Sequence, residues 1–251
     1  MSILVRAARK GANALLRRVQ PDNQIYADWD VIWFIREYVF QFDGKTYDLF
    51  IHKYNCGWPP GRMTERSVEL ALADQWLDDP AHADVLEIGA VTPYYWPKRV
   101  KTVVDPGDDH PLVTAKTSMM DLDLTGRHVL AISTLEHVGN GEYGLPPLPL
   151  EVISAFEKLF REAEAFLVTV PLGYNPTLDA YLERGDGIPS DVSLKYLVRS
   201  PEGGNGWREA ERPSKEQARY GPLGVDRSRG SWANAVAVFR RRSKASRPES
   251  P

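Results

Sequence analysis

The chain has 251 residues, a single cysteine and a formal net charge of −3 at pH 7. This length can bury one sizeable core but leaves little room for two full domains, and one cysteine excludes both an intramolecular disulfide and a cluster of thiolate metal ligands. The sequence contains no run of about 18 apolar residues, so no transmembrane span is expected, and the low cysteine content favours a reducing, cytoplasmic compartment.

The two ends of the chain are basic and its middle is acidic. Residues 1–20 contain five basic side chains and no acidic one, and residues 240–251 have a net charge of +4, which leaves −12 for the rest. The simpler interpretation is two solvated ends on an acidic body, with no nucleic-acid partner. The alternative is a docking surface for an anionic lipid, a nucleic acid or another acidic partner.

Residues 1–63 are expected to form an addition to the core. The apolar residues of the first 20 positions fall on one helical face, which predicts an amphipathic helix that docks on its own protein or on a sister subunit in a homodimer. Apolar and polar side chains then alternate in residues 38–42 and 47–51, on either side of Asp43-Gly44. This pattern predicts a β-hairpin, and an N-terminal hairpin of this kind often forms a lid or a substrate wall.

Residues 64–240 are predicted to form the core. A helix is expected after Thr64, which has a side chain suited to capping, and Pro80 stops it. Val85-Leu86-Glu87-Ile88 is a short apolar run with one acid inside it, and Gly89 follows. This pattern indicates a buried parallel strand that opens into a tight turn.

The remaining elements alternate between strands and helices. A second β-branched run, Thr102–Val104, ends at Asp105, and only a short or irregular helix is expected after it. The later predictions are a helix at 152–163 and strands at 128–133, 166–170, 196–199 and 233–239. Residues 201–231 are expected to cross the active face as a long excursion, and residues 241–251 to form a basic disordered tail.

The turn after the first core strand indicates which cofactor fits. A dinucleotide site needs G-x-G-x-x-G because its backbone approaches a pyrophosphate, whereas this loop has only Gly89 and the chain has no Walker lysine. Asp105 lies eighteen residues after Glu87, near the spacing at which such folds place an acid against a ribose. A loop so poor in glycine suits a cofactor with a ribose and an adenine but no phosphates, for which S-adenosylmethionine is the obvious candidate.

Three segments together resemble the class I S-adenosylmethionine-dependent methyltransferases: Val85–Gly89, Val103–Asp105 and Ile132–His137. The resemblance covers roughly residues 64–240, and the chain looks most like the sugar O-methyltransferases of polysaccharide pathways. It implies an α/β, Rossmann-like class I methyltransferase fold, with a mostly parallel seven-stranded sheet and an antiparallel last strand. The chain departs from the family because the second and third glycines of its first motif are missing.

The residues that follow the strands form the candidate site, because ligands of open α/β sheets bind past the carboxyl ends of the strands. The residues predicted to bind the cofactor are Glu87, Gly89, Ala90, Asp105, Met120, Asp121 and Ser133. Asp105 suits the ribose hydroxyls, and Asp121 suits the adenine amine with Met120 against the ring. The resemblance implies that Glu87 and Gly89 line the methionine end.

Methyl transfer to a hydroxyl also needs a base, since an alcohol is a poor nucleophile until it loses its proton. His137 is the candidate base, and Glu136 either orients the imidazole or helps to hold Mg²⁺ through oxygen ligands. Alternatively, both residues merely begin a helix. Arg66 either pairs with the cofactor carboxylate or forms a surface salt bridge. The residues predicted to face the substrate are Tyr94, Tyr143, Asn175 and Asp179.

The sequence thus predicts an S-adenosylmethionine-dependent O-methyltransferase that acts on a hydroxyl of a sugar or glycan precursor. The transfer is in-line and is assisted by a general base or a metal ion. The fourth core strand ends in Ser133-Thr134-Leu135-Glu136, which differs from the Asn/Asp-Pro-Pro-Tyr/Phe of DNA N-methyltransferases. The alternative is a non-catalytic subunit with a methyltransferase fold that docks a partner through its basic ends.

Overall fold

The computed structural model describes most of the predicted core and part of the N-terminal addition. The described ranges are residues 39–50, 56–57, 62–82, 84–142, 147–199, 206–221 and 232–242. The predicted first helix, the tail beyond residue 242 and Tyr143 lie outside them. No helix within these ranges is long and apolar enough to cross a membrane.

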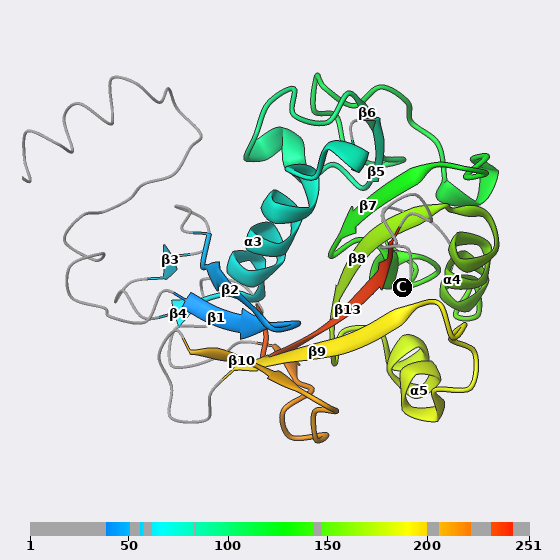
Figure 1. Cartoon of the computed structure of the whole chain (residues 1–251). Helices are drawn as coiled ribbons and strands as arrows, with labels where there is room; N and C mark the ends of the chain where they lie inside the picture. Colours follow the sequence, from blue (N-terminus) through cyan, green and yellow to red (C-terminus); the bar gives the residue numbers. More distant parts are fainter. Residues whose placement is uncertain are drawn as a thin grey trace, which may run out of the picture.

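A seven-stranded sheet forms the centre of the fold, with the strand order β10-β9-β13-β8-β7-β5-β6 (Figure 1). Its strands are β5 (Val85–Ile88), β6 (Thr102–Val104), β7 (His128–Ile132), β8 (Ala165–Pro171), β9 (Ser193–Arg199), β10 (Trp207–Ala210) and β13 (Ala235–Arg241). β5, β6, β7, β8 and β9 run in one direction, and β10 and β13 run against them. The predicted α/β class, with a mostly parallel sheet and an antiparallel last strand, is confirmed.

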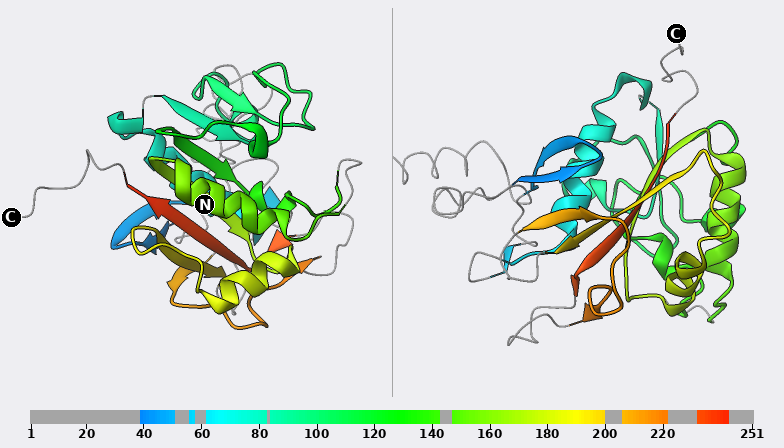
Figure 2. Two further views of the ribbon diagram at one scale, coloured as in Figure 1. Left: turned by 90° about the vertical axis from the view of Figure 1, so that its right-hand side faces the viewer. Right: turned by 60° about the horizontal axis from the view of Figure 1, so that its bottom comes forward.

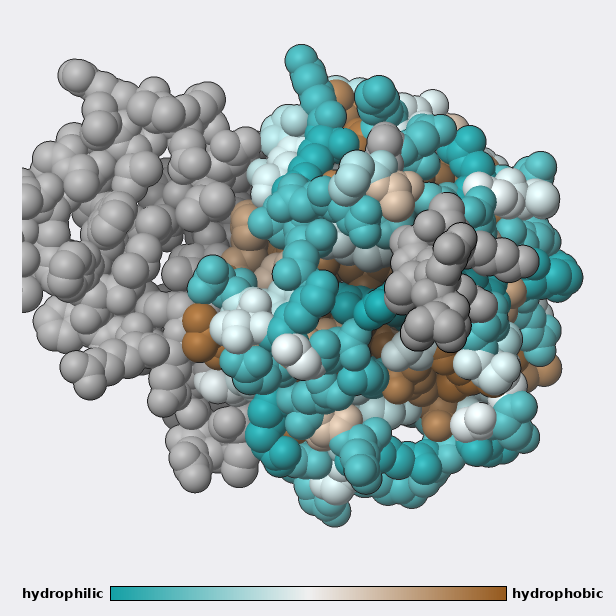
Figure 3. Space-filling model, viewed as in Figure 1, coloured by the Kyte–Doolittle hydropathy of each residue, from teal (hydrophilic) through white to brown (hydrophobic). Residues whose placement is uncertain are grey.

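Helices cover both faces of this sheet, as the two views of Figure 2 show. The α-helices are α3 (Glu65–Leu77), α4 (Glu151–Glu162) and α5 (Pro176–Arg184). Side chains of β7 alternate between the faces: Val129 and Ala131 pack with α4 and α5, whereas Leu130 and Ile132 pack with α3. Each fully buried aliphatic side chain contributes about 1.5–3 kcal/mol. Burial on both faces of the sheet explains the near-continuous apolar runs of the parallel strands. On the outside of the molecule, hydrophilic residues cover most of the described surface shown in Figure 3.

The predicted hairpin is present as β1 (Val39–Phe42) and β2 (Lys45–Asp48). Its turn residues, Asp43 and Gly44, have φ values of 52° and 72°, as a two-residue type I′ turn requires. The hairpin contacts β10 and buries aromatic side chains in the α3 side of the core: Phe40, Phe42 and Tyr47. Lys195 of β9 pairs with Asp43 at 2.9 Å. The hairpin is therefore part of the core and does not form the expected lid or substrate wall.

Short elements complete the described chain. Two small antiparallel pairs are β3 (Cys56–Gly57) with β4 (Arg62–Met63), and β11 (Tyr220–Gly221) with β12 (Trp232–Ala233). Between β6 and β7 the chain forms only a 3₁₀ turn, Met119–Asp121, in agreement with the short or irregular helix expected there.

β10 corrects the prediction of an uninterrupted excursion over residues 201–231. This four-residue strand pairs with β9 and buries Trp207, whose ring lies 5.1 Å from the guanidinium carbon of Arg199. Its sequence, Trp-Arg-Glu-Ala, contains a single large apolar side chain. Such a short segment gives too little alternation to predict a strand, and the pairing is decided by the neighbouring edge of β9.

Candidate active site

A cavity of about 490 Å³ lies at the carboxyl ends of β5, β6 and β7, the edge at which open α/β sheets bind ligands. Loops after these strands and the first turns of α3 and α4 line it. Its polar and charged lining comprises Arg66, Asp105, Asp108, Ser118, Ser133, Thr134, His137, Glu142 and Glu151. The structure brings together here five of the residues predicted from the sequence: Gly89, Ala90, Asp105, Ser133 and His137.

Gly89 allows the loop after β5 to lie directly against the loop after β7. Its φ is +86°, and a Cβ atom at this position would lie 2.1 Å from Thr134 Oγ1. Glycine alone meets both demands, because other residues disfavour this backbone region and no side chain fits the gap. A single glycine is thus enough to bring the two strand ends into contact beside the cavity.

Glu87 holds the loop that follows Gly89. One carboxylate oxygen accepts hydrogen bonds from the backbone N–H groups of Val91, at 3.0 Å, and Thr92, at 2.7 Å. The other accepts the hydroxyl of Thr92. Burial raises the pKa of Glu87 to about 7, although the hydrogen bonds from Thr92 and Val91 act to lower it. The side chain is fully buried and does not line the cavity, so its role in the structure is to shape the loop.

Asp105 accepts hydrogen bonds from three backbone N–H groups at the cavity wall. Its Oδ2 accepts a hydrogen bond from Ala90 N–H at 2.9 Å, and its Oδ1 accepts from Gly107 and Asp108 N–H, each at 2.8 Å. A carboxylate offers about four acceptor positions, so Oδ2 keeps capacity for a hydroxyl of a ligand. Asp105 thus lies directly after β6 and at the cavity, as predicted, and its contact with a ribose stays a prediction.

The two residues predicted to contact the adenine do not line the cavity. Ser118 and Met119 line the cavity, whereas Met120 and the exposed Asp121 do not. The Ser118 hydroxyl accepts from Met120 N–H at 3.2 Å and starts the 3₁₀ turn. Within one such turn, successive side chains point in different directions, and the sequence contains no periodicity that fixes which one faces inward.

Ser133 ends β7 with a φ of +44°, an uncommon conformation for a residue other than glycine. Its hydroxyl donates to the buried Glu69 at 2.6 Å. Arg66, one turn earlier on α3, lies 3.7 Å from the other Glu69 oxygen and donates to the carbonyl of Ile132 at 3.3 Å. These contacts fix the end of β7 to α3 and hold the Arg66 guanidinium at the cavity. The Arg66 side chain therefore lines the cavity, and its role is not limited to a salt bridge on the surface.

His137 lies at the cavity within a group of hydrogen-bonded polar side chains. Its Nδ1 is 2.6 Å from Glu142 Oε2 and 3.1 Å from the Tyr174 hydroxyl. The other oxygen of Glu142 accepts from Tyr174 and from Asn140 Nδ2. Burial acts to raise the pKa of Glu142, but the hydrogen bonds from Tyr174, His137 and Asn140 lower it. An ionised Glu142 therefore orients the imidazole.

Sequence reasoning missed Glu142 and Tyr174. Glu142 lies in the segment between His137 and α4, where only Tyr143 was predicted from the sequence as a site residue. Tyr174 belongs to the loop after β8, a position where ligand contacts are expected in this kind of sheet, although no pattern distinguished it from its neighbours. An acid five residues after a histidine in an irregular segment gives no signal of contact.

Glu136 is placed differently from its prediction. The side chain is 1% exposed and does not line the cavity. Its Oε1 lies 3.6 Å from His137 Nε2, which is longer than a hydrogen bond, and its Oε2 has no hydrogen-bond partner in the described part of the chain. Burial raises its pKa well above the usual value, so that the neutral acid is favoured. Within the described residues, no group of three or more His, Cys, Asp or Glu side chains is arranged to hold a metal ion.

The predicted substrate-facing residues are dispersed. Asn175 is buried, caps α5 through Thr177 and Leu178 N–H, and donates to the carbonyl of Glu136 at 2.8 Å. Tyr94 donates to Asp108 at the cavity rim, and Asp179 lines a second cavity. Tyr143 lies outside the described residues.

The main cavity is acidic. Arg66 is the one permanent cation among the described residues that line it, against four carboxylates: Asp105, Asp108, Glu142 and Glu151. This lining favours a ligand that carries positive charge together with a carboxylate or hydroxyl groups. In comparisons with known proteins, no family model, no curated protein and no solved structure matches the chain. The function of this cavity is therefore inferred from its own geometry and chemistry.

Proposed function

We propose that the protein is an S-adenosylmethionine-dependent O-methyltransferase with a class I methyltransferase fold. The observation that carries the proposal is one cavity at the carboxyl ends of β5–β7, with Asp105 on one wall and the His137–Glu142 pair on another. An acid after β6 and an oriented base after β7, the strands on either side of β5, line one 490 Å³ space, which suits a nucleoside cofactor beside a hydroxyl acceptor.

The cavity residues provide a contact for each part of this cofactor. Asp105 would accept the ribose hydroxyls, and Met119 with Ser118 would border the adenine. Arg66 would pair with the carboxylate, and the acidic lining suits the sulfonium and ammonium charges. When bound, the cofactor supplies an already activated methyl group, so the protein has mainly to align the acceptor and remove its proton.

His137 acts as the base in this proposal. Donation from Nδ1–H to Glu142 selects the tautomer in which Nε2 is the basic nitrogen. Nε2 would accept the acceptor's hydroxyl proton as the methyl group passes to its oxygen and S-adenosylhomocysteine leaves, and Glu142 would stabilise the resulting imidazolium. Mg²⁺ was predicted through Glu136, but this buried carboxyl group does not fit a metal ligand at the cavity, and no step is assigned to a metal ion.

The acceptor is proposed to be a sugar or glycan precursor, on the basis of the sequence resemblance. Tritium-labelled S-adenosylmethionine, incubated with the protein and a set of glycans, tests the reaction by transfer of label. Calorimetry with S-adenosylhomocysteine tests the cofactor site separately, and lack of binding would contradict the proposal at its first step.

Asp105→Ala tests the ribose contact directly. We expect S-adenosylhomocysteine to bind about 1.5–3 kcal/mol more weakly, because a charged hydrogen-bond acceptor is lost. Asp108→Ala is the matched control, because it removes a neighbouring carboxylate at the cavity rim but leaves in place the three backbone N–H groups bound to Asp105. Unchanged affinity in the Asp105 variant would show that the ribose is bound elsewhere.

A further inference from the structure

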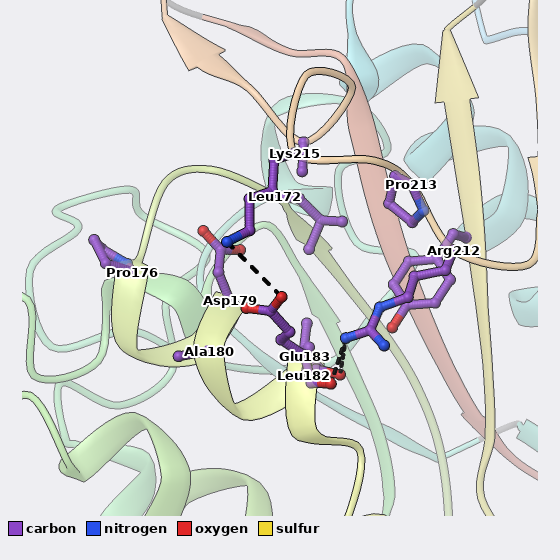
Figure 4. A pocket seen from close by; sticks show the side chains of 11 residues that line it. Leu172, Pro176, Asp179, Ala180, Leu182, Glu183, Arg212, Pro213 and Lys215 are labelled. Carbon is purple, nitrogen blue, oxygen red and sulfur yellow. Dashed lines mark hydrogen bonds and ion pairs between the residues drawn. The ribbon is translucent and has the colours of Figure 1, made fainter.

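A second cavity, of about 380 Å³, lies between α5, β9 and the segment after β10 (Figure 4). Its walls combine apolar side chains, among them Leu172, Leu182 and Pro213, with polar groups from Asp179 and Tyr196. A space of this size with apolar faces and a few polar groups is characteristic of ligand sites. None of its residues contributes to the main cavity.

The charges around this second cavity are balanced. Lys215 lies 3.9 Å from Glu183, and Arg212 donates to the carbonyls of Leu182 and Glu183 at the end of α5; Figure 4 shows both contacts. With two cations and two carboxylates in the lining, the cavity has no net charge to attract an ionic ligand. Its ligand is therefore expected to be neutral.

Asp179 supplies the hydrogen-bonding capacity. Its two oxygens accept from Gly173 N–H at 3.2 and 3.0 Å, which leaves acceptor positions on both. Burial raises the pKa of this carboxyl group, so the position suits neutral donors that restore its hydrogen bonds. Vicinal hydroxyl groups over apolar walls meet these requirements together.

The second cavity adjoins the proposed reacting centre through a single loop. Leu172 lines it, Gly173 binds Asp179, and the hydroxyl of the next residue, Tyr174, is 3.1 Å from His137 Nδ1. The Tyr174 and Tyr220 rings meet edge to face, with centroids 4.7 Å apart. Three consecutive residues thus connect the candidate base with the polar wall of the second cavity.

We infer that the second cavity is an acceptor subsite that binds a neutral polyhydroxylated unit adjoining the unit that is methylated. The inference rests on the proposed function, because the bound unit is part of a methyl acceptor only if the protein is a methyltransferase. It extends that function by requiring a substrate longer than one such unit. Binding energy from the distant unit would position the reacting hydroxyl at His137.

The test uses neutral trisaccharides as probes, namely maltotriose, cellotriose and mannotriose, with the corresponding monosaccharides. Saturation-transfer difference NMR on the full chain measures their binding without any turnover. Ala180→Phe places a bulky ring at the exposed rim of the second cavity. Thr177→Phe is the matched control, because both residues border the neighbouring groove between α4 and α5, but Thr177 does not line the second cavity.

We expect at least one trisaccharide to bind the wild type more tightly than its monosaccharide does. The same trisaccharide should bind Ala180→Phe at least tenfold more weakly than it binds the wild type. Its affinity for Thr177→Phe should equal that for the wild type. Asp179→Asn, which preserves shape, should also weaken binding. The absence of binding by every trisaccharide, or equal effects of the two phenylalanine variants, would overturn the inference. Calorimetry with S-adenosylhomocysteine separates the two claims: retained trisaccharide binding without cofactor binding leaves the subsite intact and rejects the proposed function.

Discussion

At His137 two carboxyl groups approach the two ring nitrogens at different distances. Glu142 lies 2.6 Å from Nδ1, and Glu136 lies 3.6 Å from Nε2. Hydrogen bonds lower the pKa of Glu142, which orients the ring as a carboxylate, whereas burial raises the pKa of Glu136 and favours its neutral form. Two glutamates near one histidine therefore have different roles, which follow from their different burial.

His137→Ala should lower kcat by about 10²–10⁴-fold, the usual effect of removing a general base. Affinity for S-adenosylhomocysteine should change little, because the proposed cofactor contacts lie on other residues. Steady-state kinetics and calorimetry measure the two quantities. Tyr174→Phe removes the hydroxyl that contacts Glu142 and His137 Nδ1 but leaves the contact between Glu142 and the imidazole. It is the control and should lose less activity. Turnover near that of the wild type in His137→Ala would assign the base to another group.

Gly89→Ala should destabilise the protein and weaken cofactor binding. The added methyl group meets Thr134, and alanine at positive φ costs about 1–3 kcal/mol. The double variant Gly89→Ala/Thr134→Ala removes the two nearest atoms, Oγ1 and Cγ2 of Thr134, but it leaves the Cβ of residue 134 at 2.8 Å and the backbone strain. It should therefore recover only part of the free energy of unfolding. Chemical denaturation gives these values, and a Gly89→Ala protein as stable as the wild type would disprove the close approach.

Residues directly after a strand were predictable from the sequence, because strand ends fix where side chains converge. Asp105 and Ser133 are of this kind, and both line the cavity. Met120 was predicted to face the cofactor, whereas Met119 is the residue that lines the cavity, since a single 3₁₀ turn has no repeat that fixes which side chain faces inward. Glu142 depends on a contact across an irregular loop, and such contacts are determined by tertiary packing alone.

Among the elements, the junction of α3 with β7 contains an unusual pair of histidines. His82 Nδ1 and His128 Nδ1 are 3.0 Å apart, so one ring donates to the other, and Trp76 stacks on His82 at 3.9 Å. The pKa of His82 is lowered to about 4, mainly by burial and to a smaller extent by the neighbouring His128. Asp79 acts in the opposite direction, and Glu164 lies 4.0 Å from the far nitrogen of His128.

This pair predicts a loss of stability in mild acid. The unfolded chain binds a proton at His82 near pH 6.5, whereas the folded chain does so only near pH 4. The contribution of His82 to the free energy of unfolding is therefore complete above pH 6.5. It falls, by roughly 3 kcal/mol at most, as the pH drops towards 4. His82→Asn should flatten this dependence in urea denaturation between pH 7 and 4.5. Parallel pH profiles for wild type and variant would refute the assignment.

The element predictions succeeded where a pattern was long or specific. Asp43-Gly44 between alternating segments was enough to predict the hairpin, because few backbones allow positive φ at two successive residues. The run Val85–Ile88 indicated a strand because both of its faces are buried. Trp207–Ala210 is too short for either signal, and its pairing with β9 comes from the completed sheet.

At the scale of the whole molecule, the acidic lining of the main cavity predicts a difference between cofactor and product. S-adenosylmethionine carries a sulfonium charge that S-adenosylhomocysteine lacks. We expect affinity for the former to fall more steeply as salt rises from low to physiological concentration, where the screening length is about 8 Å. Calorimetry at several salt concentrations, without acceptor, measures both slopes. Glu151→Gln should reduce the difference, and equal slopes in the wild type would contradict it.

The position of β13 has a consequence for how the molecule is made. This strand follows all the other sheet strands in the described chain, yet it lies between β8 and β9. During synthesis on the ribosome, β5–β8 can pair as they emerge, and β9 can pair with β10, but these two groups of strands cannot join until residues 235–241 leave the exit tunnel. The nascent chain thus carries an unpaired edge on β8, which is prone to wrong association. β13 joins the two halves of the sheet, and only then can the wall that contains Tyr196 close beside α5.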